Sequence, residues 1–344
     1  MISRATLMLF FSLALPLCAY SQTIQYSAEL NNLAVGSRQI ALGEAGVALP
    51  LSIMSAYYNP ATLSFLRNYQ ANVEYANLYE GLARHICIGL EAPLQQDITV
   101  GGIYSAFSSG NIPLFDSLPG TYEERLATDS LRATGVARGS FRNDQNLIMF
   151  PLAKLFPLPG IYTTGLSYPL PIELSFGCNF KIYWQTFNPR QVVRLGMNFN
   201  CDVGLLARFG VDYDLVKKRV SRELFIGVMV RDALPTRVVW VYSPQNYEEP
   251  LERTELFGVS YIDRSGFLAT DWIVTASLVR SFGISYQAGI EAVWWEMVSL
   301  RAGVVGRTPV IGAGIRYKRY SIDYSLRFDE LAISPVRLTA GLTF

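Results

Sequence analysis

The chain has 344 residues, half of them hydrophobic, and its 29 basic residues nearly balance its 28 acidic ones. Balanced charge argues against nucleic acid as a partner. The mean hydropathy is positive, yet beyond the N-terminal region no segment approaches the roughly 18 uninterrupted apolar residues of a membrane-crossing helix. High hydrophobicity without such helices favours a closed β-barrel. A large water-soluble β-protein is the alternative that the strand pattern has to decide.

Residues 1–21 have the pattern of a cleavable signal peptide. Arg4 supplies a positive start, residues 7–17 are a short apolar run, and Ala19-Tyr20-Ser21 has small residues at the two positions that a signal peptidase reads. Lipidation at Cys18 is one rival reading, although the residue before it is larger than such signals prefer. An uncleaved anchor is the other, although the run is short for a span. The pattern predicts export.

Residues 22–68 lack strand-like alternation and are expected to form a compact segment. Small residues recur between residues 36 and 49, and Asn59-Pro60 favours a turn or a helix start, because proline fixes its own φ and pushes the preceding residue out of the α region. Small residues allow close packing against other backbone. Such a segment fits the inside of a barrel better than a surface.

From about residue 69 onward the chain alternates between apolar and polar residues with a period of two. The clearest run is 320–328, where Tyr, Ile, Leu and Phe occupy one face and Ser, Asp and Arg the other. The polar faces mix glycine with isolated charges of both signs, which suits a crowded interior better than the open face of a soluble sandwich. The opposite faces are apolar, as lipid requires. A membrane barrel is therefore favoured over a soluble barrel or sandwich.

Charged residues of this alternation are expected on the interior face of the barrel. They could line a polar path, or they could form a network that fills the barrel around the preceding segment. The expected interior charges are Lys181, Asp202, Arg208, Glu291, Arg301, Arg316, Asp323 and Arg327.

Fourteen strands are expected, which is the even number that single-chain bacterial barrels favour. With the N-terminus in the periplasm, the two longest gaps, 108–160 and 232–252, fall on the outer side, where long loops belong. The apolar run 143–152 inside the first gap could be a strand or a short helix. The last strand ends on Phe344 with alternate apolar residues, and we predict that this terminus is the signal for membrane insertion. The expected strands are 69–79, 83–93, 97–107, 161–168, 172–187, 192–209, 221–231, 253–263, 270–280, 284–293, 297–306, 310–317, 320–328 and 334–344.

The residues that could carry chemistry form no recognisable constellation. His85 is the sole histidine and shares a strand face with Cys87 and Glu91. A hydrolase must be considered, but no nucleophile and orienting acid can be assigned beside it, so we predict no enzymatic activity. Cys178 and Cys201 lie on apolar faces of sequential strands and could be bonded, although unpaired thiols are the default. No Cys/His spacing suggests a metal, and no cofactor is expected.

The stretch Gly36-x-Arg38-x-x-x-x-Gly43-x-x-Gly46, followed by Ala56-Tyr57-Tyr58-Asn59-Pro60-Ala61-x-Leu63, resembles the opening of the PorV/PorQ family, within the wider FadL-type outer-membrane superfamily. Residues 174–181, 200–206 and 291–304 also resemble strands of that family. The resemblance implies an all-β, 14-stranded antiparallel transmembrane β-barrel over residues 69–344, with an N-terminal hatch, residues 22–68, in its lumen. The hatch and gating residues that it implies are Gly36, Arg38, Gly43, Gly46, Asn59, Pro60 and Ala61.

Two functions are then expected for a protein in the outer membrane of a Gram-negative cell. In FadL-type relatives the hatch gates the diffusion of hydrophobic compounds, which implies a passive, gated route for small hydrophobic molecules. PorV and PorQ instead serve type IX protein secretion, which implies a non-transporting accessory. The expected partners are outer-membrane lipid and lipopolysaccharide, the barrel-assembly machinery, and either hydrophobic small molecules or secretion-system proteins.

Overall fold

The computed structural model describes residue 30 and residues 33–115, 118–131, 135–161, 170–187, 194–214, 219–241, 248–266, 270–281, 283–328 and 336–344. The predicted signal peptide lies outside these residues, as does most of 22–32. Within the described residues, no helix is both long and apolar enough to cross a membrane.

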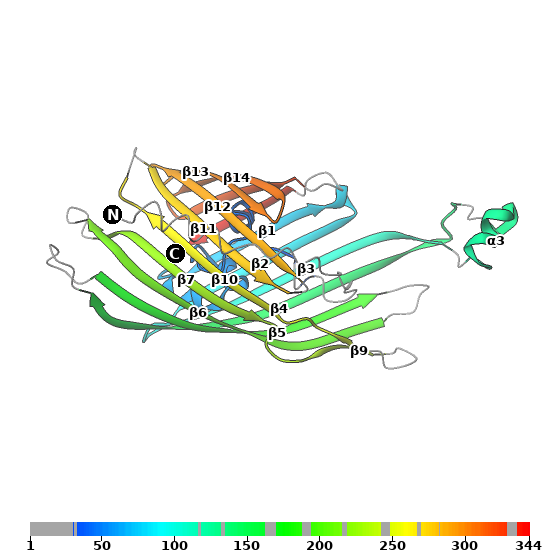
Figure 1. Cartoon of the computed structure of the whole chain (residues 1–344), viewed down its shortest axis with the longest axis horizontal. Helices are drawn as coiled ribbons and strands as arrows, with labels where there is room; N and C mark the ends of the chain where they lie inside the picture. Colours follow the sequence, from blue (N-terminus) through cyan, green and yellow to red (C-terminus); the bar gives the residue numbers. More distant parts are fainter. Residues whose placement is uncertain are drawn as a thin grey trace.

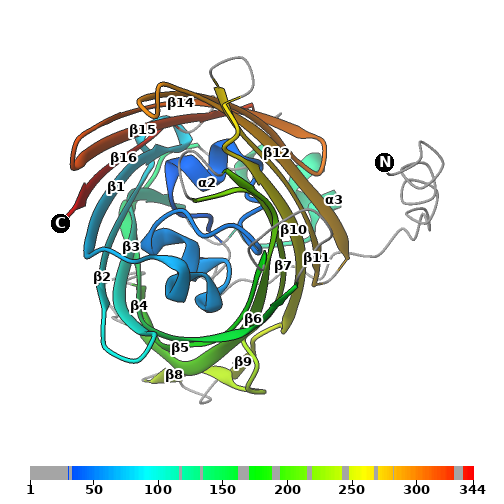
Figure 2. The ribbon, with the colours of Figure 1, turned by 90° about the vertical axis from the view of Figure 1, so that its left-hand side faces the viewer.

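Fourteen strands pair antiparallel with their neighbours and close into one barrel (Figures 1 and 2), so the predicted all-β fold and strand number are confirmed. The first strand, β1 (Gln70–Leu78), pairs with both β2 (Ala83–Pro93) and the last strand, β16 (Val336–Thr343). The remaining wall strands are β3 (Ile98–Leu114), β4 (Gly139–Ile161), β5 (Leu170–Phe187), β6 (Arg194–Asp214), β7 (Arg219–Arg231), β10 (Thr254–Asp263), β11 (Thr270–Arg280), β12 (Ile284–Trp294), β13 (Val298–Val305), β14 (Thr308–Tyr317) and β15 (Tyr320–Arg327).

The two ends of the barrel differ in length. At one end, which we call the hairpin end, β3 and β4 run far beyond their neighbours and carry α3 (Tyr122–Ala127) and η5 (Asp129–Leu131) near their tip (Figure 1). The short hairpin of β8 (Arg237–Val241) and β9 (Glu248–Pro250) extends β6 at the same end. The opposite end, the turn end, holds the start of β1 and the end of β16.

Side chains along each strand alternate between an exposed, apolar outer face and a buried inner face. On β1, Val73 and Tyr75 are 49% and 47% exposed, while Glu74 between them is fully buried. On β2, Ile86 and Ile88 are exposed, and His85 and Cys87 are buried. Because this contrast recurs around the wall, the barrel presents aliphatic and aromatic side chains outward and most of its charges inward.

The predicted fourth strand was misplaced. The fourth strand is β4, residues 139–161, so the supposed loop 108–160 is mostly the long β3–β4 hairpin, and the run 143–152 is strand. Both faces of β4 are apolar, with Leu147 and Met149 buried and Phe150 and Leu152 exposed. Alternation is the signal for a strand, and it is lost where neither face is polar. Residues 162–168 of the predicted strand lie outside the described part. Similarly, the supposed loop 232–252 contains β8 and β9.

Residues 33–66, which we call the luminal segment, lie inside the barrel. Figure 2 looks into the barrel from the end opposite α3 and shows this segment, in blue, surrounded by strands. It contains α2 (Ser37–Ala41), η2 (Ile53–Tyr57) and η3 (Pro60–Phe65). All but seven of its residues are buried. Asn59 caps η3 by accepting from the Ala61 N–H at 3.0 Å, with Pro60 at the first helical position, which is the arrangement that proline and an Asx cap favour.

Candidate functional site

Glycines of the wall let the luminal segment lie directly against the strands. A Cβ added at Gly289 of β12 would lie 2.6 Å from Leu42 Cα, and one at Gly303 of β13 would lie 2.8 Å from Gly43 Cα. Gly43 itself has a φ of +68°, and a Cβ on it would lie 2.6 Å from the Val304 carbonyl oxygen. Any side chain at these positions would push the segment off the wall, because real Cβ contacts this short are not tolerated.

The same kind of contact recurs on the far side of the lumen. A Cβ at Gly177 of β5 would lie 2.5 Å from the Pro60 carbonyl carbon, and one at Gly227 of β7 would lie 2.5 Å from the Val47 carbonyl oxygen. Asn59 adds polar contacts, since its Nδ2 donates to the carbonyls of Val47 at 2.8 Å and Leu205 at 3.1 Å. The backbone of the segment is therefore fitted to opposite walls.

Further hydrogen bonds hold the second half of the segment to β5. The Ser175 hydroxyl donates to the Ala61 carbonyl at 2.8 Å, and Asn179 Nδ2 donates to the Ala56 carbonyl at 2.9 Å. Both side chains are fully buried. These bonds tie the backbone of η2 and η3 to β5.

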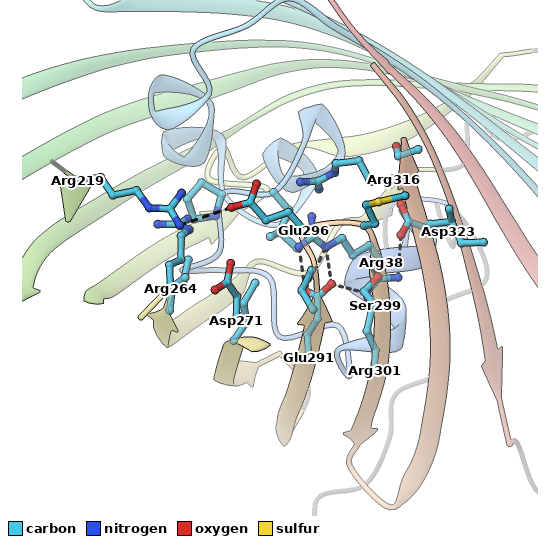
Figure 3. Close-up of a pocket in the computed structure, with 18 residues that line it drawn as sticks. Arg38, Arg219, Arg264, Asp271, Glu291, Glu296, Ser299, Arg301, Arg316 and Asp323 are labelled. Carbon is cyan, nitrogen blue, oxygen red and sulfur yellow. Dashed lines mark hydrogen bonds and ion pairs between the residues drawn. The ribbon is translucent and has the colours of Figure 1, made fainter. Parts of the chain in front are cut away.

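A buried chain of ion pairs ties α2 to the wall near the turn end (Figure 3). Arg38 donates to both oxygens of Glu291, with Nη2 to Oε2 at 2.9 Å, and Arg301 Nε donates to the other side of the same carboxylate at 2.9 Å. Arg301 Nη1 lies 2.7 Å from Asp323 Oδ1. Glu291 is fully buried, and Arg38 is 14% exposed. The network joins the segment to β12, β13 and β15.

Two more polar clusters fix the first half of the segment. Glu44 pairs with Arg327 at 2.9 Å. Arg337 of β16 donates to the Ala34 carbonyl at 2.7 Å, and the Thr339 hydroxyl lies 2.8 Å from the hydroxyl of Ser37. The α2 half of the segment is thus held by charges and hydroxyls in addition to apolar packing, in which Ile40 lies against Val310 and Leu42 lies in one cluster with Ile273.

A further charged cluster lies next to η2. Lys181 pairs with Asp202 at 2.7 Å and with Asp232 at 2.5 Å, all three being buried. The Arg231 guanidinium lies 4.7 Å from the centre of the Tyr57 ring. These charged side chains fill the barrel interior next to η2 and contact it at Tyr57.

One part of the lumen wall is largely apolar. On the inward faces of β3 to β5, Ile103, Leu147, Met149 and Tyr183 are buried in one cluster with Ile53, Met54 and Tyr57 of η2, and with Val238 of β8. Phe107, Trp240 and Leu251 pack against this cluster toward the hairpin end. Porin interiors are typically polar. We call this surface the apolar wall.

The lumen also contains a polar cavity at the turn end, with a volume of about 290 Å³. Figure 3 shows its charged lining, which combines five arginines with four carboxylates, and Arg316 enters it beside Arg38. A neighbouring cavity of about 240 Å³ shares Arg38, Leu51, Arg316, Ser321 and Asp323 with it.

The structure places each of the predicted site residues. Among the interior charges, Glu291, Arg301, Arg316 and Asp323 meet around Arg38, Lys181 lies with Asp202, and Arg327 contacts Glu44. Arg208 pairs with Glu173 at 2.5 Å and also with Glu223. Gly36, φ +82°, precedes α2, and Gly46 packs on the Tyr58 ring. Asn59, Pro60 and Ala61 begin η3 against the glycines of β5 and β6. Phe344 is 61% exposed, and its N–H donates to the Tyr69 carbonyl at 2.9 Å.

Sequence reasoning missed several residues that hold the segment, among them Glu44, Arg231, Asp232 and Arg337. Arg337 could have been found, since it alternates with Leu338 and therefore faces inward. Arg231 could also have been found, since it continues the inward face of β7 after Phe225 and Met229. Asp232 could not, because it follows the last residue of β7, where alternation ends.

A hydroxyl and a carboxylate flank the ring of His85, although the sequence alone allowed no nucleophile and orienting acid to be assigned beside it. Its Nε2 lies 2.7 Å from the Ser105 hydroxyl, and its Nδ1 lies 3.6 Å from Glu74. All three are buried, and Glu74 also contacts Arg337 and Thr339. Three adjacent strands bring these residues together, so sequence spacing alone did not reveal them. The cluster lies packed in the barrel interior. Cys87, Cys178 and Cys201 are free thiols.

No group of three or more His, Cys, Asp or Glu residues able to hold a metal ion occurs among the described residues.

No protein-family model matches the sequence, and no curated protein matches it. Three solved structures are similar over 90% of this chain. The Ralstonia pickettii toluene transporter TbuX is 11% identical, with 98% of its chain covered and a TM-score of 0.47. The Pseudomonas putida toluene transporter TodX is 13% identical, with 97% covered and a TM-score of 0.44. The TodX monoaromatic hydrocarbon channel deltaS2 mutant is 12% identical, with 97% covered and a TM-score of 0.46. The resemblance to PorV and PorQ stays a prediction. Because these identities and TM-scores are low, the function has to be inferred from the side chains of this chain.

Proposed function

We propose that this chain is an outer-membrane barrel with a passive route for small hydrophobic molecules, and that residues 22–68 form the hatch that gates it. The observation that carries the proposal is the apolar wall. The Ile, Leu and Met side chains of this wall offer water and polar solutes no hydrogen-bonding partners, and the Tyr183 hydroxyl is already bonded to Gln145 and Gln185. An apolar solute can replace the side chains of η2 there with little loss. The belt of exposed aliphatic and aromatic residues supports the placement in a membrane, with the hairpin end outside the cell.

The contacts of the segment favour η2 as the part that moves. The α2 half is held by ion pairs, and η3 is held by buried hydrogen bonds to β5 and β6, which a hydrophobic solute cannot replace. On the side of β5, η2 has one such bond, from Asn179 to the Ala56 carbonyl. On the side of β2 and β3, by contrast, Ile53 and Met54 meet the wall through apolar contacts. Ile53 lies against Gly89 and Gly101, and Met54 Sδ lies 3.7 Å from Cys87 Sγ. Non-directional contacts of this kind re-form easily with a solute in between.

A reversible disulfide tests the gate. The Met54→Cys variant, made with Cys178→Ser and Cys201→Ser, places a thiol opposite the native Cys87. Oxidation is expected to join η2 to β2 and to abolish the uptake of an apolar solute such as toluene by proteoliposomes, and reductant should restore it. The double-serine chain without the new cysteine is the matched control and should be indifferent to oxidation. Unchanged uptake in the bonded form, once the bond is verified by mass, would refute η2 as the gate.

The secretion-accessory role is not proposed, because no contact surface in the described part of the chain specifically favours it.

A further inference from the structure

The outward face of the barrel has a polar groove near the hairpin end, where the β1–β2 turn stops and β3 and β4 continue. Its volume is about 390 Å³, and its lining combines two arginines, Arg84 and Arg142, with Ser108, Asn111, Ser140 and a few apolar or glycine residues. A Cβ added at Gly110 would meet nothing within 4 Å. The groove is therefore open to the surroundings beside the projecting β3–β4 hairpin, and it lies outside the lumen.

The register of the strands fixes the level of this groove along the barrel. Arg84 of β2 is paired with Ser108 of β3, and Ser108 is paired with Asp144 of β4. Four residues further toward the turn end, the same outward faces carry Ile88, Tyr104 and Ile148, which pair with one another. The groove thus lies at the boundary of the apolar belt.

Two outward tyrosines lie two and four residues from the groove toward the turn end, at the edge of the apolar belt. Tyr75 and Tyr104 point outward, and the Tyr104 hydroxyl donates to Asn146 Oδ1 at 2.8 Å. Tyr rings with an apolar body and a polar tip concentrate where hydrocarbon gives way to headgroups. A polar groove just beyond these tyrosines therefore faces lipid headgroups.

The charges in the groove favour an anion. Arg142 is held in place, since its Nη2 donates to Ser108 Oγ at 3.1 Å and its Nε lies 3.0 Å from Asp144. No ion pair joins Arg84 to a carboxylate within the described part of the chain. Two guanidinium groups against one carboxylate leave the groove net positive, and the planar guanidinium is the side chain best suited to a phosphate.

We propose that this groove binds the phosphorylated headgroup of an outer-leaflet lipid, a phosphorylated glucosamine of the lipopolysaccharide class. Arg84 and Arg142 contact the phosphate, and Ser108, Ser140 and Asn111 supply hydroxyl and amide partners to the sugar. The acyl chains lie along Ile86 and Ile88, which are 41% and 40% exposed. The inference requires the barrel to be in the outer membrane, but it is independent of what passes through the lumen.

Lipid binding to the purified full-length chain tests the site. Native mass spectrometry in detergent measures binding of bis-phosphorylated lipid A, of its dephosphorylated form, and of inorganic phosphate. The Arg84→Ala/Arg142→Ala variant is expected to lose about tenfold or more in affinity for the phosphorylated lipid, since two charge-assisted contacts are removed. The control is Lys154→Ala, which removes an outward cation of β4 that stacks on Phe156 instead and should bind as the parent does.

Three results would overturn the proposal. They are unchanged affinity in the double variant, an equal loss in the Lys154 variant, and equal affinity for the dephosphorylated lipid. Inorganic phosphate that binds as tightly as the lipid would identify a free anion as the ligand and would also refute the lipid assignment. Arg84→Ala alone breaks no ion pair of the described structure, so it supplies a variant whose folding is not at risk. Its boiling-dependent mobility on gels checks that the barrel has closed, and solute uptake should stay unchanged.

Discussion

Glu291 accepts from both Arg38 and Arg301, and the Glu291→Gln variant would keep its shape while removing its charge. Breaking a buried ion pair by altering one partner typically costs about 3–5 kcal/mol. Arg301 keeps Asp323 at 2.7 Å, and Arg38 is 14% exposed to the polar cavity. We therefore expect a lower cost of about 2–3 kcal/mol to the docking of α2.

Hydrogen exchange of the α2 amides, measured by mass spectrometry in micelles, reports the free-energy cost of opening this helix. The Ile40 and Gly43 amides donate to Gly36 and Ile40 carbonyls at 2.9 Å, and they exchange when α2 opens. A cost of 2–3 kcal/mol corresponds to roughly 30- to 150-fold faster exchange where exchange follows the opening equilibrium.

Two comparisons make the prediction sharp. Arg38→Ala should cost less than Glu291→Gln, because Glu291 then keeps Arg301 as its partner. Asp97→Asn breaks an ion pair whose side chains are 58% and 43% exposed, and it should change stability by less than about 0.5 kcal/mol. If Glu291→Gln exchanges no faster than Asp97→Asn, the ion-pair network does not hold the segment.

Three further outcomes are expected. Gly43→Ala should weaken docking of the segment by about 2 kcal/mol or more, because it combines a positive φ with a clash against wall carbonyls. Proteolytic release of the segment measures this weakening, and resistance to protease equal to that of the parent chain would contradict the prediction. Asn59→Ala should cost about 1–3 kcal/mol, since it leaves buried carbonyls without a donor, and Asn59→Asp should not rescue it in thermal unfolding. Deleting Phe344 should leave stability within about 0.5 kcal/mol, as for other exposed sites, while it slows insertion into bilayers; an unchanged insertion rate would argue against its role as a signal.

The fold was predictable where one face of a strand is polar and the other apolar. β15, with Tyr320 and Ile322 opposed to Ser321 and Asp323, could be identified from sequence alone. β4 could not, since its inward face is as apolar as its outward face. The residue pattern that hid the strand is the same pattern that forms the apolar wall.

The interior charges were predictable as inward-facing residues but not as pairs. Alternation places Glu291, Arg301 and Asp323 on one face each, but only the register across β12 to β15 brings them to one point. The partner from the segment, Arg38, was picked out through the family resemblance, and nothing in its spacing indicated a contact with Glu291. Register is set by turns and by packing across the whole barrel, which local sequence does not determine.

The glycines of the wall also bear on the order in which the molecule assembles. Residues 33–66 precede every described strand, and their backbone lies against glycines on opposite walls of the lumen. β16 closes the barrel against β1, and it also carries Arg337 and Thr339, which hold Ala34 and Ser37. The strand that completes the barrel therefore bonds to the start of the luminal segment, and we expect this segment to be in place before the β1–β16 seam closes.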